Sequence, residues 1–284
     1  MRPAFSLYSR RAKVPAREYE PVKIVRFLKD EQVRYGLLEG ERIDVLNGEP
    51  FEAVRPSGVK AALGDVQLLA PVNPPNVLAI GLNYRRHALE TNAAIPDCPL
   101  LFIKASTAVM GPDEPIVLPA MAPDEVDYEA ELAVVIGRAA RNVSTAEALS
   151  HVLGYACGND VSARDCQKRL DRQWARAKSF DTFCPLGPWI ETDLDPTNAP
   201  VRCRVNGQTM QDSNTSDMIF PCAELISYLS HCMTLLPGTV IMTGTPSGVG
   251  VARQPAVYLR PGDVVEVEIG GVGVLRNPVA AAKP

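Results

Sequence analysis

The chain has 284 residues, of which 46% are hydrophobic, so it is long enough to bury one large core together with a small accessory domain. Its 29 basic and 33 acidic residues are well mixed and give a net charge of −4, so the composition indicates neither a nucleic acid nor an anionic membrane as a partner. No apolar run approaches the roughly 20 residues that a membrane-spanning helix requires.

The N-terminal segment is basic and lacks the apolar core of a signal peptide. It carries Arg2, Arg10, Arg11 and Lys13 and has no acidic residue before Glu18. Such a segment is either a simple basic extension or a weak organelle-targeting sequence. The seven cysteines show no paired spacing, so we expect them to be reduced. The sequence therefore predicts a cytoplasmic protein, or a mitochondrial one if the N-terminal segment is a targeting sequence.

Short apolar runs with turn residues between them dominate the first part of the chain. They cover residues 22–28, 33–38 and 43–46 and predict a small antiparallel meander. A proline-rich stretch at residues 71–75 follows, and consecutive prolines cannot lie inside a strand ladder. We therefore expect an extension and a small β-meander domain at residues 1–70, and a catalytic domain at residues 71–284.

The rest of the chain predicts a mixed α/β fold that is rich in strands. The expected strands are residues 76–81, 126–137, 152–159 and 240–243, and a hairpin of residues 264–269 and 272–275 around Gly270-Gly271. Three helices are expected. One begins at about Tyr84, one begins at a capping box spanning Ser144 to Glu147 and ends at about His151, and one begins at Pro221 and ends near Met233.

Two glutamates two residues apart lie within one of these strands. Because side chains alternate along a strand, Glu129 and Glu131 point to the same face, where ionised carboxylates would repel and lose solvation unless a cation joined them. Asp160 ends the strand at residues 152–159 and is the expected third ligand. Carboxylate ligands without histidine or cysteine favour Mg²⁺ or Mn²⁺, with Ca²⁺ as the structural alternative. Solvated glutamates on an edge strand are the alternative, although the apolar run at 132–136 predicts burial on both faces.

A histidine and a glutamate lie at positions i and i+3 of the predicted helix near residue 84. Glu90 would then orient the imidazole of His87 as a general base. An exposed pair near a helix end is the alternative. Lys178 lies among apolar residues rather than in a charge run, which suits stabilisation of a developing enolate, and a surface lysine is its alternative.

A dense polar set follows Asp160. Arg164 and Gln167 have the chemistry to receive a substrate carboxylate or carbonyl, unless Arg164 and Asp165 merely pair with each other or cap a turn.

The glycine-rich loop at residues 243–250 resembles an anion cradle in composition. Pro246 and the residues up to Pro255 deny it the helix that a dinucleotide site requires, so we reject that site. Its amides and Thr245 would instead hold a substrate carboxylate, or the loop is an ordinary turn. Ser247 lacks the context of an elbow nucleophile, and the sequence gives no support for covalent catalysis.

Together these segments resemble the fumarylacetoacetate hydrolase family, in one order over about residues 76–276. The matching motifs are Gly81-Leu-Asn-Tyr-x-x-His87-x-x-Glu90, Phe102-Ile-Lys104, Val126-Asp-Tyr-Glu129-Ala-Glu131-Leu, Asn159-Asp160-Val-Ser-Ala-Arg164-Asp-x-Gln167, Lys178-Ser-Phe-Asp-Thr-Phe-Cys-Pro185 and Thr243-Gly-Thr245-Pro-Ser-Gly-Val-Gly250. Within the family the chain is most similar to the fumarylacetoacetate hydrolase domain-containing protein 2 branch, through residues 179–188 and 204–215.

The resemblance implies a β-sandwich roll, usually in a homodimer. It also implies a Mg²⁺ or Mn²⁺ ion held by Glu129, Glu131 and Asp160, and a His87–Glu90 pair on a segment that orders over bound ligand. The residues implied to act on or bind the substrate are Lys178, Arg164, Gln167, Thr245 and Lys104. Cys166 and Ala177 depart from the branch, which commonly has an aromatic residue and a glycine there, so the shape of the pocket is expected to differ.

Substrates of the family are 2-oxo acids or 1,3-dioxo acids. We predict hydrolysis of a C–C bond in an acylpyruvate or diketo acid, with His87 activating water. The alternative is enol–keto tautomerisation of oxaloacetate, or its decarboxylation, at the same site. A catalytically inert metal-binding relative is the alternative of another class, and the presence of His87, Glu90, Lys178 and Gln167 together argues against it.

Overall fold

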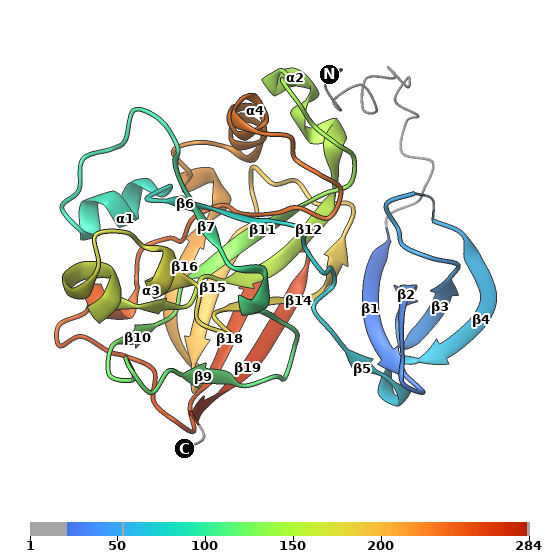
Figure 1. Cartoon of the computed structure of the whole chain (residues 1–284), viewed down its shortest axis with the longest axis horizontal. Coiled ribbons are helices and arrows are strands. Elements are labelled where there is room, and N and C mark those ends of the chain that lie inside the picture. The colour runs from blue at the N-terminus through green and yellow to red at the C-terminus, as the bar shows by residue number, and fades with distance from the viewer. Residues whose placement is uncertain (1–21, 53, 283–284) are drawn as a thin grey trace, which may run out of the picture.

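The protein is built around a large mixed sheet (Figure 1). Its computed structural model describes residues 22–52 and 54–282. Within these residues the sheet has 12 strands, with a main path of ten and two that pair at its side. The path runs β4 (Pro56–Ala62), β3 (Arg42–Leu46), β2 (Gln32–Glu39), β1 (Lys23–Lys29), β14 (Cys184–Glu191), β12 (Val152–Asn159), β11 (Ala130–Ile136), β17 (Val240–Met242), β6 (Val77–Gly81) and β7 (Leu100–Lys104). Beside it, β5 (Gln67–Leu68) pairs with β1, and β8 (Val109–Met110) pairs with β14.

A second sheet of 5 strands packs against the middle of the first one. Its order is β16 (Gln208–Asn214), β15 (Pro200–Val205), β18 (Val264–Ile269), β19 (Gly273–Ala281) and β9 (Ile116–Leu118). Strands β15, β18 and β19 lie against β11, β12 and β14 in Figure 1, and apolar side chains of both layers form the main core. The predicted mixed, strand-rich fold is confirmed.

The N-terminal meander of β1 to β4 stands to one side of this sandwich (Figure 1). It has a small core of its own, which includes Val25, Phe27 and Ile43. The meander nevertheless continues the large sheet, because Lys23 and Ile24 of β1 pair with Glu191 and Ile190 of β14. The basic segment at residues 2–13 lies outside the described residues.

Helices are few and short. They are α1 (Arg85–Glu90), α2 (Thr145–Ala148), α3 (Ala175–Lys178) and α4 (Cys222–Cys232). Pro221 precedes α4 as its extended N-cap, so the helix begins one residue later than predicted. The predicted capping box does not form its backbone bonds, because the Ser144 hydroxyl donates to the Glu147 carboxylate at 2.9 Å instead. In the described part of the chain, no helix is long and apolar enough to cross a membrane.

The strand predicted at residues 126–137 is interrupted, which corrects the sequence-based expectation. β10 (Val126–Asp127) pairs with β13 (Ser162–Ala163), whereas β11 begins only at Ala130. Tyr128 and Glu129 lie in the break, where the chain leaves the small two-stranded ladder and enters the large sheet. Every residue of β11 is buried, as its apolar run predicts.

Candidate metal centre and active site

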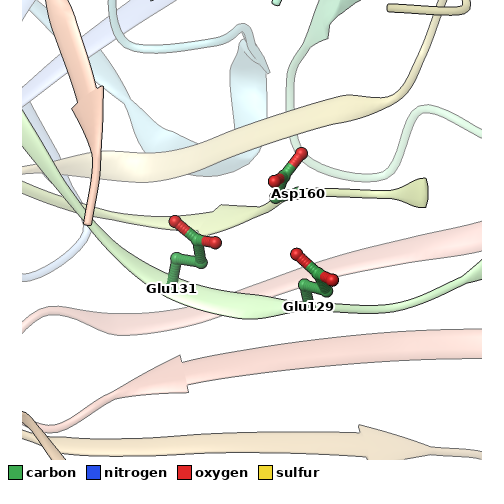
Figure 2. A group of neighbouring side chains, drawn as sticks. All are labelled: Glu129, Glu131 and Asp160. Carbon is green, nitrogen blue, oxygen red and sulfur yellow. The ribbon is translucent and has the colours of Figure 1, made fainter. Parts of the chain in front are cut away.

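The ladder between β11 and β12 brings three carboxylates together. Ala130 pairs with Asn159, and the Asp160 N–H donates to the Glu129 carbonyl at 2.9 Å, so Asp160 lies beside Glu129 on the neighbouring strand. Figure 2 shows Glu129, Glu131 and Asp160 grouped in this way, and one oxygen from each lies within 4.8 Å of the others. The three residues are 6%, 1% and 1% exposed. The alternative of solvated glutamates on an edge strand is therefore wrong.

Basic side chains neutralise two of these carboxylates. Lys178 Nζ lies 2.8 Å from Glu129 Oε2 and 2.6 Å from Asp160 Oδ2, and Arg164 Nη2 lies 2.7 Å from Glu129 Oε1. Lys104 also donates to Asp160. Burial by itself raises the pKa of Glu129, but Lys178 and Arg164 outweigh it and lower that pKa to about 2.

Glu131 lacks such a neutralising partner among the described residues. It accepts a hydrogen bond from the Gly244 N–H at 2.8 Å and forms no ion pair. Burial, followed by the nearby charges of Asp160 and Glu129, raises the pKa of Glu131 well above 4.5. When all the buried acids are ionised, the negative charge without a basic partner is therefore the one on Glu131.

The charge balance supports a cation at this position. The buried acids around the centre are Asp127, Glu129, Glu131 and Asp160, and the buried bases are Lys104, Arg164 and Lys178. With all four acids ionised, four acids against three bases leave one negative charge, which a divalent cation would turn into one positive charge. Oxygen ligands alone suit a hard ion such as Mg²⁺, Mn²⁺ or Ca²⁺, so the residues fit the predicted metal.

The three carboxylates line a pocket with a volume of about 400 Å³. His87, Arg164, Gln167, Lys178 and Thr245, all predicted from the sequence, line it as well. Its apolar wall includes Ile80, Leu100, Phe102, Trp174, Val249 and Val251. A small cavity with acids and bases at one part and apolar walls around it is typical of an enzyme site for a small polar molecule.

The predicted contact between His87 and Glu90 is present in α1. Nδ1 of His87 lies 3.0 Å from Glu90 Oε2, while Glu90 Oε1 accepts from the Gly248 N–H at 2.8 Å. Glu90 therefore ties the helix to the glycine-rich loop and fixes the imidazole ring. The other ring nitrogen, Nε2, has no protein partner in the described part of the structure.

Arg164 is held from three sides. Its Nε donates to Asp127 Oδ2 at 2.9 Å and its Nη1 donates to Gln167 Oε1 at 2.8 Å, in addition to the contact with Glu129. The alternative pairing of Arg164 with Asp165 does not form. Asp165 instead caps the turn that begins at Cys166, because its carboxylate accepts from the Cys166 N–H at 2.7 Å.

Both predicted lysines are buried. Lys178, the last residue of α3, is 2% exposed and lies 5.2 Å from the ring centre of Phe102, so it is not a surface lysine. Lys104 is 1% exposed and contacts Asp160, and it does not line the pocket. The structure therefore places Lys104 behind a predicted ligand rather than against the pocket.

The amides of the glycine-rich loop bind the protein's own carboxylates. Gly244, Gly248 and Gly250 donate to Glu131, Glu90 and Asp127, respectively. A Cβ at Gly250 would lie 1.9 Å from the Val257 carbonyl oxygen and 2.6 Å from Asp127 Oδ1, so only glycine fits there. These amides are already paired, so they are not free to form the predicted cradle for a substrate carboxylate.

Two residues of the site were missed by the sequence analysis. Asp127 is fully buried and accepts from Arg164 and from the N–H groups of Gly250 and Val251. It lies two residues before Glu129, which is the spacing between Glu129 and Glu131, and this spacing could have identified it from the sequence although the strand is interrupted here.

Gln211 of β16 is the second missed residue. It donates to the Thr245 hydroxyl at 2.8 Å, and Thr245 in turn donates to the Ala130 carbonyl at 3.0 Å. Gln211 is distant in the sequence and carries no local pattern that relates it to the site.

A strand sandwich that gathers carboxylates, lysines and an imidazole–carboxylate pair around one small pocket is typical of an enzyme. The chain belongs to the fumarylacetoacetate hydrolase family. The family model described as fumarylacetoacetate (FAA) hydrolase C-terminal matches residues 76–280, and a model described as Rv2993c-like, N-terminal matches residues 22–71.

Similar proteins include both tautomerases and isomerases. A protein of Xenopus laevis named oxaloacetate tautomerase fahd2, mitochondrial, is 48% identical over 76% of this chain and 69% of its own length. Protein Rv2993c of Mycobacterium tuberculosis is 43% identical over 91% of this chain and 98% of its own. The crystal structure of 5-carboxymethyl-2-hydroxymuconate delta-isomerase from Mycobacterium smegmatis is 44% identical, covers 92% of this chain and 100% of its own, and superposes with a TM-score of 0.84.

Proposed function

We propose that the protein is a divalent-cation-dependent enzyme that interconverts the enol and keto forms of a small 2-oxo acid, with oxaloacetate as the first substrate to test. The observation that carries this proposal is the buried group of Glu129, Glu131 and Asp160, with Lys178 between two of its members. The names of the Xenopus laevis and Mycobacterium smegmatis relatives support an isomerising reaction over one that consumes water.

The three carboxylates and Lys178 have different electrostatic roles in this reaction. A divalent cation held by the three carboxylates would polarise the 2-oxo group of the substrate and acidify the adjacent carbon. Lys178 provides a buried ammonium group that Glu129 and Asp160 hold in place. Negative charge on the substrate oxygen grows as the proton leaves carbon, so Lys178 stabilises the transition state more than the ground state.

His87 is the group suited to move the proton. With Nδ1 held by Glu90, Nε2 accepts the proton from carbon 3 of the keto form and returns it in the reverse direction. As the enol forms, the protonated imidazole of His87 gives this proton to the substrate oxygen, so the reaction balances without water or an external reagent. The Glu90 carboxylate stabilises the protonated imidazole between the two steps.

Hydrolysis of a C–C bond in an acylpyruvate or diketo acid is the second candidate. The same His87–Glu90 pair favours it, because an imidazole held in this way also deprotonates a water molecule aimed at a second carbonyl. Decarboxylation of oxaloacetate uses the same charge stabilisation and gives pyruvate and carbon dioxide as its products.

Parallel assays distinguish these reactions. The purified protein with Mg²⁺ is given enol-oxaloacetate, followed by loss of enol absorbance, and an acylpyruvate, followed by loss of its diketo absorbance. We expect rapid formation of keto-oxaloacetate, little pyruvate and slow acylpyruvate cleavage. Faster acylpyruvate cleavage than tautomerisation would replace the proposal with hydrolysis. Turnover of neither substrate, with or without Mn²⁺, would refute both.

A further inference from the structure

The basic side chains at the pocket differ in whether they are already paired. Lys178 contacts Glu129 and Asp160, and Arg164 contacts Asp127, Glu129 and Gln167. Lys168 also lines the pocket, and in the described part of the chain it forms neither a hydrogen bond nor an ion pair. Lys168 is therefore the pocket cation that is free to receive an anionic group.

The local backbone explains why Lys168 and its neighbour behave differently. A π-helical turn spans Cys166–Leu170 and is closed by the bond from the Asp171 N–H to the Cys166 carbonyl at 3.0 Å. Consecutive side chains on such a turn point in different directions. Gln167 and Lys168 line the pocket, whereas Arg169 pairs with Glu125 at 2.9 Å and does not line it.

The surroundings of Lys168 favour an anion. Burial, followed by repulsion from the positive charge of Arg164, lowers the pKa of Lys168. Trp174, Val249 and Val251 of the same pocket are apolar, and although the charges of Asp127 and Glu125 act on Lys168, neither carboxylate forms an ion pair with it. A bound anion would relieve the repulsion and supply the missing partner.

Lys168 is more exposed to solvent than the metal centre. Lys178 is 2% exposed and lies among the carboxylates, whereas Lys168 is an exposed residue. A substrate whose 2-oxo acid end is held at the carboxylates would therefore present its far end to Lys168.

We propose that Lys168 binds the distal carboxylate of the substrate and so selects 2-oxo dicarboxylic acids over 2-oxo monocarboxylic acids. This inference rests on the proposed function, because it assumes that the 2-oxo acid end lies at Glu129, Glu131 and Asp160. The flexible lysine side chain contacts the carboxylate as a point charge, so diacids of more than one length are accepted.

The test compares Lys168→Met with Arg169→Met, a matched change in the adjacent cation that lies outside the pocket lining. Each protein is assayed with Mg²⁺ on enol-oxaloacetate and on the enol form of phenylpyruvate, which has no second carboxylate. In Lys168→Met we expect the ratio of KM for oxaloacetate to KM for phenylpyruvate to rise roughly tenfold, as for loss of a charge-assisted hydrogen bond. Lys168→Glu should raise it further, and Arg169→Met should leave it unchanged.

A binding measurement separates this inference from the proposed reaction. Trp174 lines the pocket, so its fluorescence reports titration with 2-oxoglutarate or with 2-oxobutyrate in the presence of Mg²⁺. We expect wild type to bind the diacid more tightly and Lys168→Met to lose that preference. Loss of the preference without any turnover would refute the reaction and support the role of Lys168. Normal turnover with unchanged KM and Kd ratios in Lys168→Met would overturn the inference alone.

Discussion

Removing the charge of Glu131 should affect the metal-free and the metal-bound protein in opposite ways. In Glu131→Gln the amide replaces the carboxylate that has no basic partner in the described structure, and it keeps an oxygen for the Gly244 N–H. We therefore expect the variant to be at least as stable as wild type in a chelator. Glu129→Gln should behave differently, because it leaves Lys178 and Arg164 short of a buried partner, which costs about 3–5 kcal/mol.

The pH dependence of the metal-free protein follows from the same carboxylate. Because the pKa of Glu131 is raised above 4.5 in the folded state, folding favours its protonated form. Stability in a chelator should therefore fall as the pH rises from 4.5 through the raised pKa. Glu131→Gln cannot ionise, so its stability curve should lack this loss.

Metal binding should make wild type more stable than Glu131→Gln. A ligand present at 100 times its Kd stabilises the folded state by about 2.7 kcal/mol. In a domain of this size each kcal/mol raises Tm by about 2–4 °C, so the expected rise in Tm is roughly 5–11 °C. If loss of the Glu131 ligand raises Kd about 100-fold, the same Mn²⁺ concentration yields only about 0.4 kcal/mol, or roughly 1 °C.

Thermal unfolding of wild type, Glu131→Gln and Glu129→Gln, each in a chelator and in Mn²⁺, measures both effects. Asp212→Asn is a suitable control, because Asp212 is an exposed acid that pairs with the exposed Arg202. The charge-balance account fails if Glu131→Gln is destabilised in the chelator as strongly as Glu129→Gln. The ligand assignment fails if Glu131→Gln retains the full shift in Mn²⁺.

Three further predictions address the remaining groups. Lys178→Met should lower kcat by about 10²-fold or more with a smaller change in KM, because its partner charge grows toward the transition state, and a change confined to KM would contradict this. His87→Ala and Glu90→Ala should each reduce turnover by roughly 10²- to 10⁴-fold, with little further loss in the double variant and with the Mn²⁺ shift retained; wild-type rates in both single variants would exclude the pair as the base. Asp127→Ala should lower the free energy of unfolding in urea by about 3–5 kcal/mol, because it removes one of the two carboxylates that pair with buried Arg164 and the acceptor of the Gly250 and Val251 N–H groups, and a loss under 1 kcal/mol would show that Asp127 is dispensable.

The features predicted correctly from the sequence depend on local periodicity. The two-residue spacing of Glu129 and Glu131 predicts that their carboxylates lie together, and they do, although Glu129 precedes β11. The three-residue spacing of a helix brings His87 to 3.0 Å from Glu90. The apolar run of β11 likewise predicts its burial on both faces. In each case, neighbours along the chain determine the geometry.

The features that could not be predicted depend on contacts between distant segments. Nothing local to Lys104 indicates that it contacts Asp160, and nothing local to Gln211 indicates that it binds Thr245. The interruption at Tyr128 arises because β10 pairs with β13, which is a tertiary pairing. The amides of the glycine-rich loop were predicted to bind substrate, but carboxylates from distant strands and helices occupy them first.

The charges of the pocket, taken together, match a doubly charged substrate. The buried acids and bases leave one negative charge, and the proposed divalent cation converts it into one positive charge. Lys168 adds a second positive charge at the exposed wall. A 2-oxo monocarboxylate would neutralise only one of them, whereas a 2-oxo dicarboxylate neutralises both. With the cation bound, a dicarboxylate would therefore leave the pocket neutral. The preference for diacids follows from the same charge balance that favours the cation.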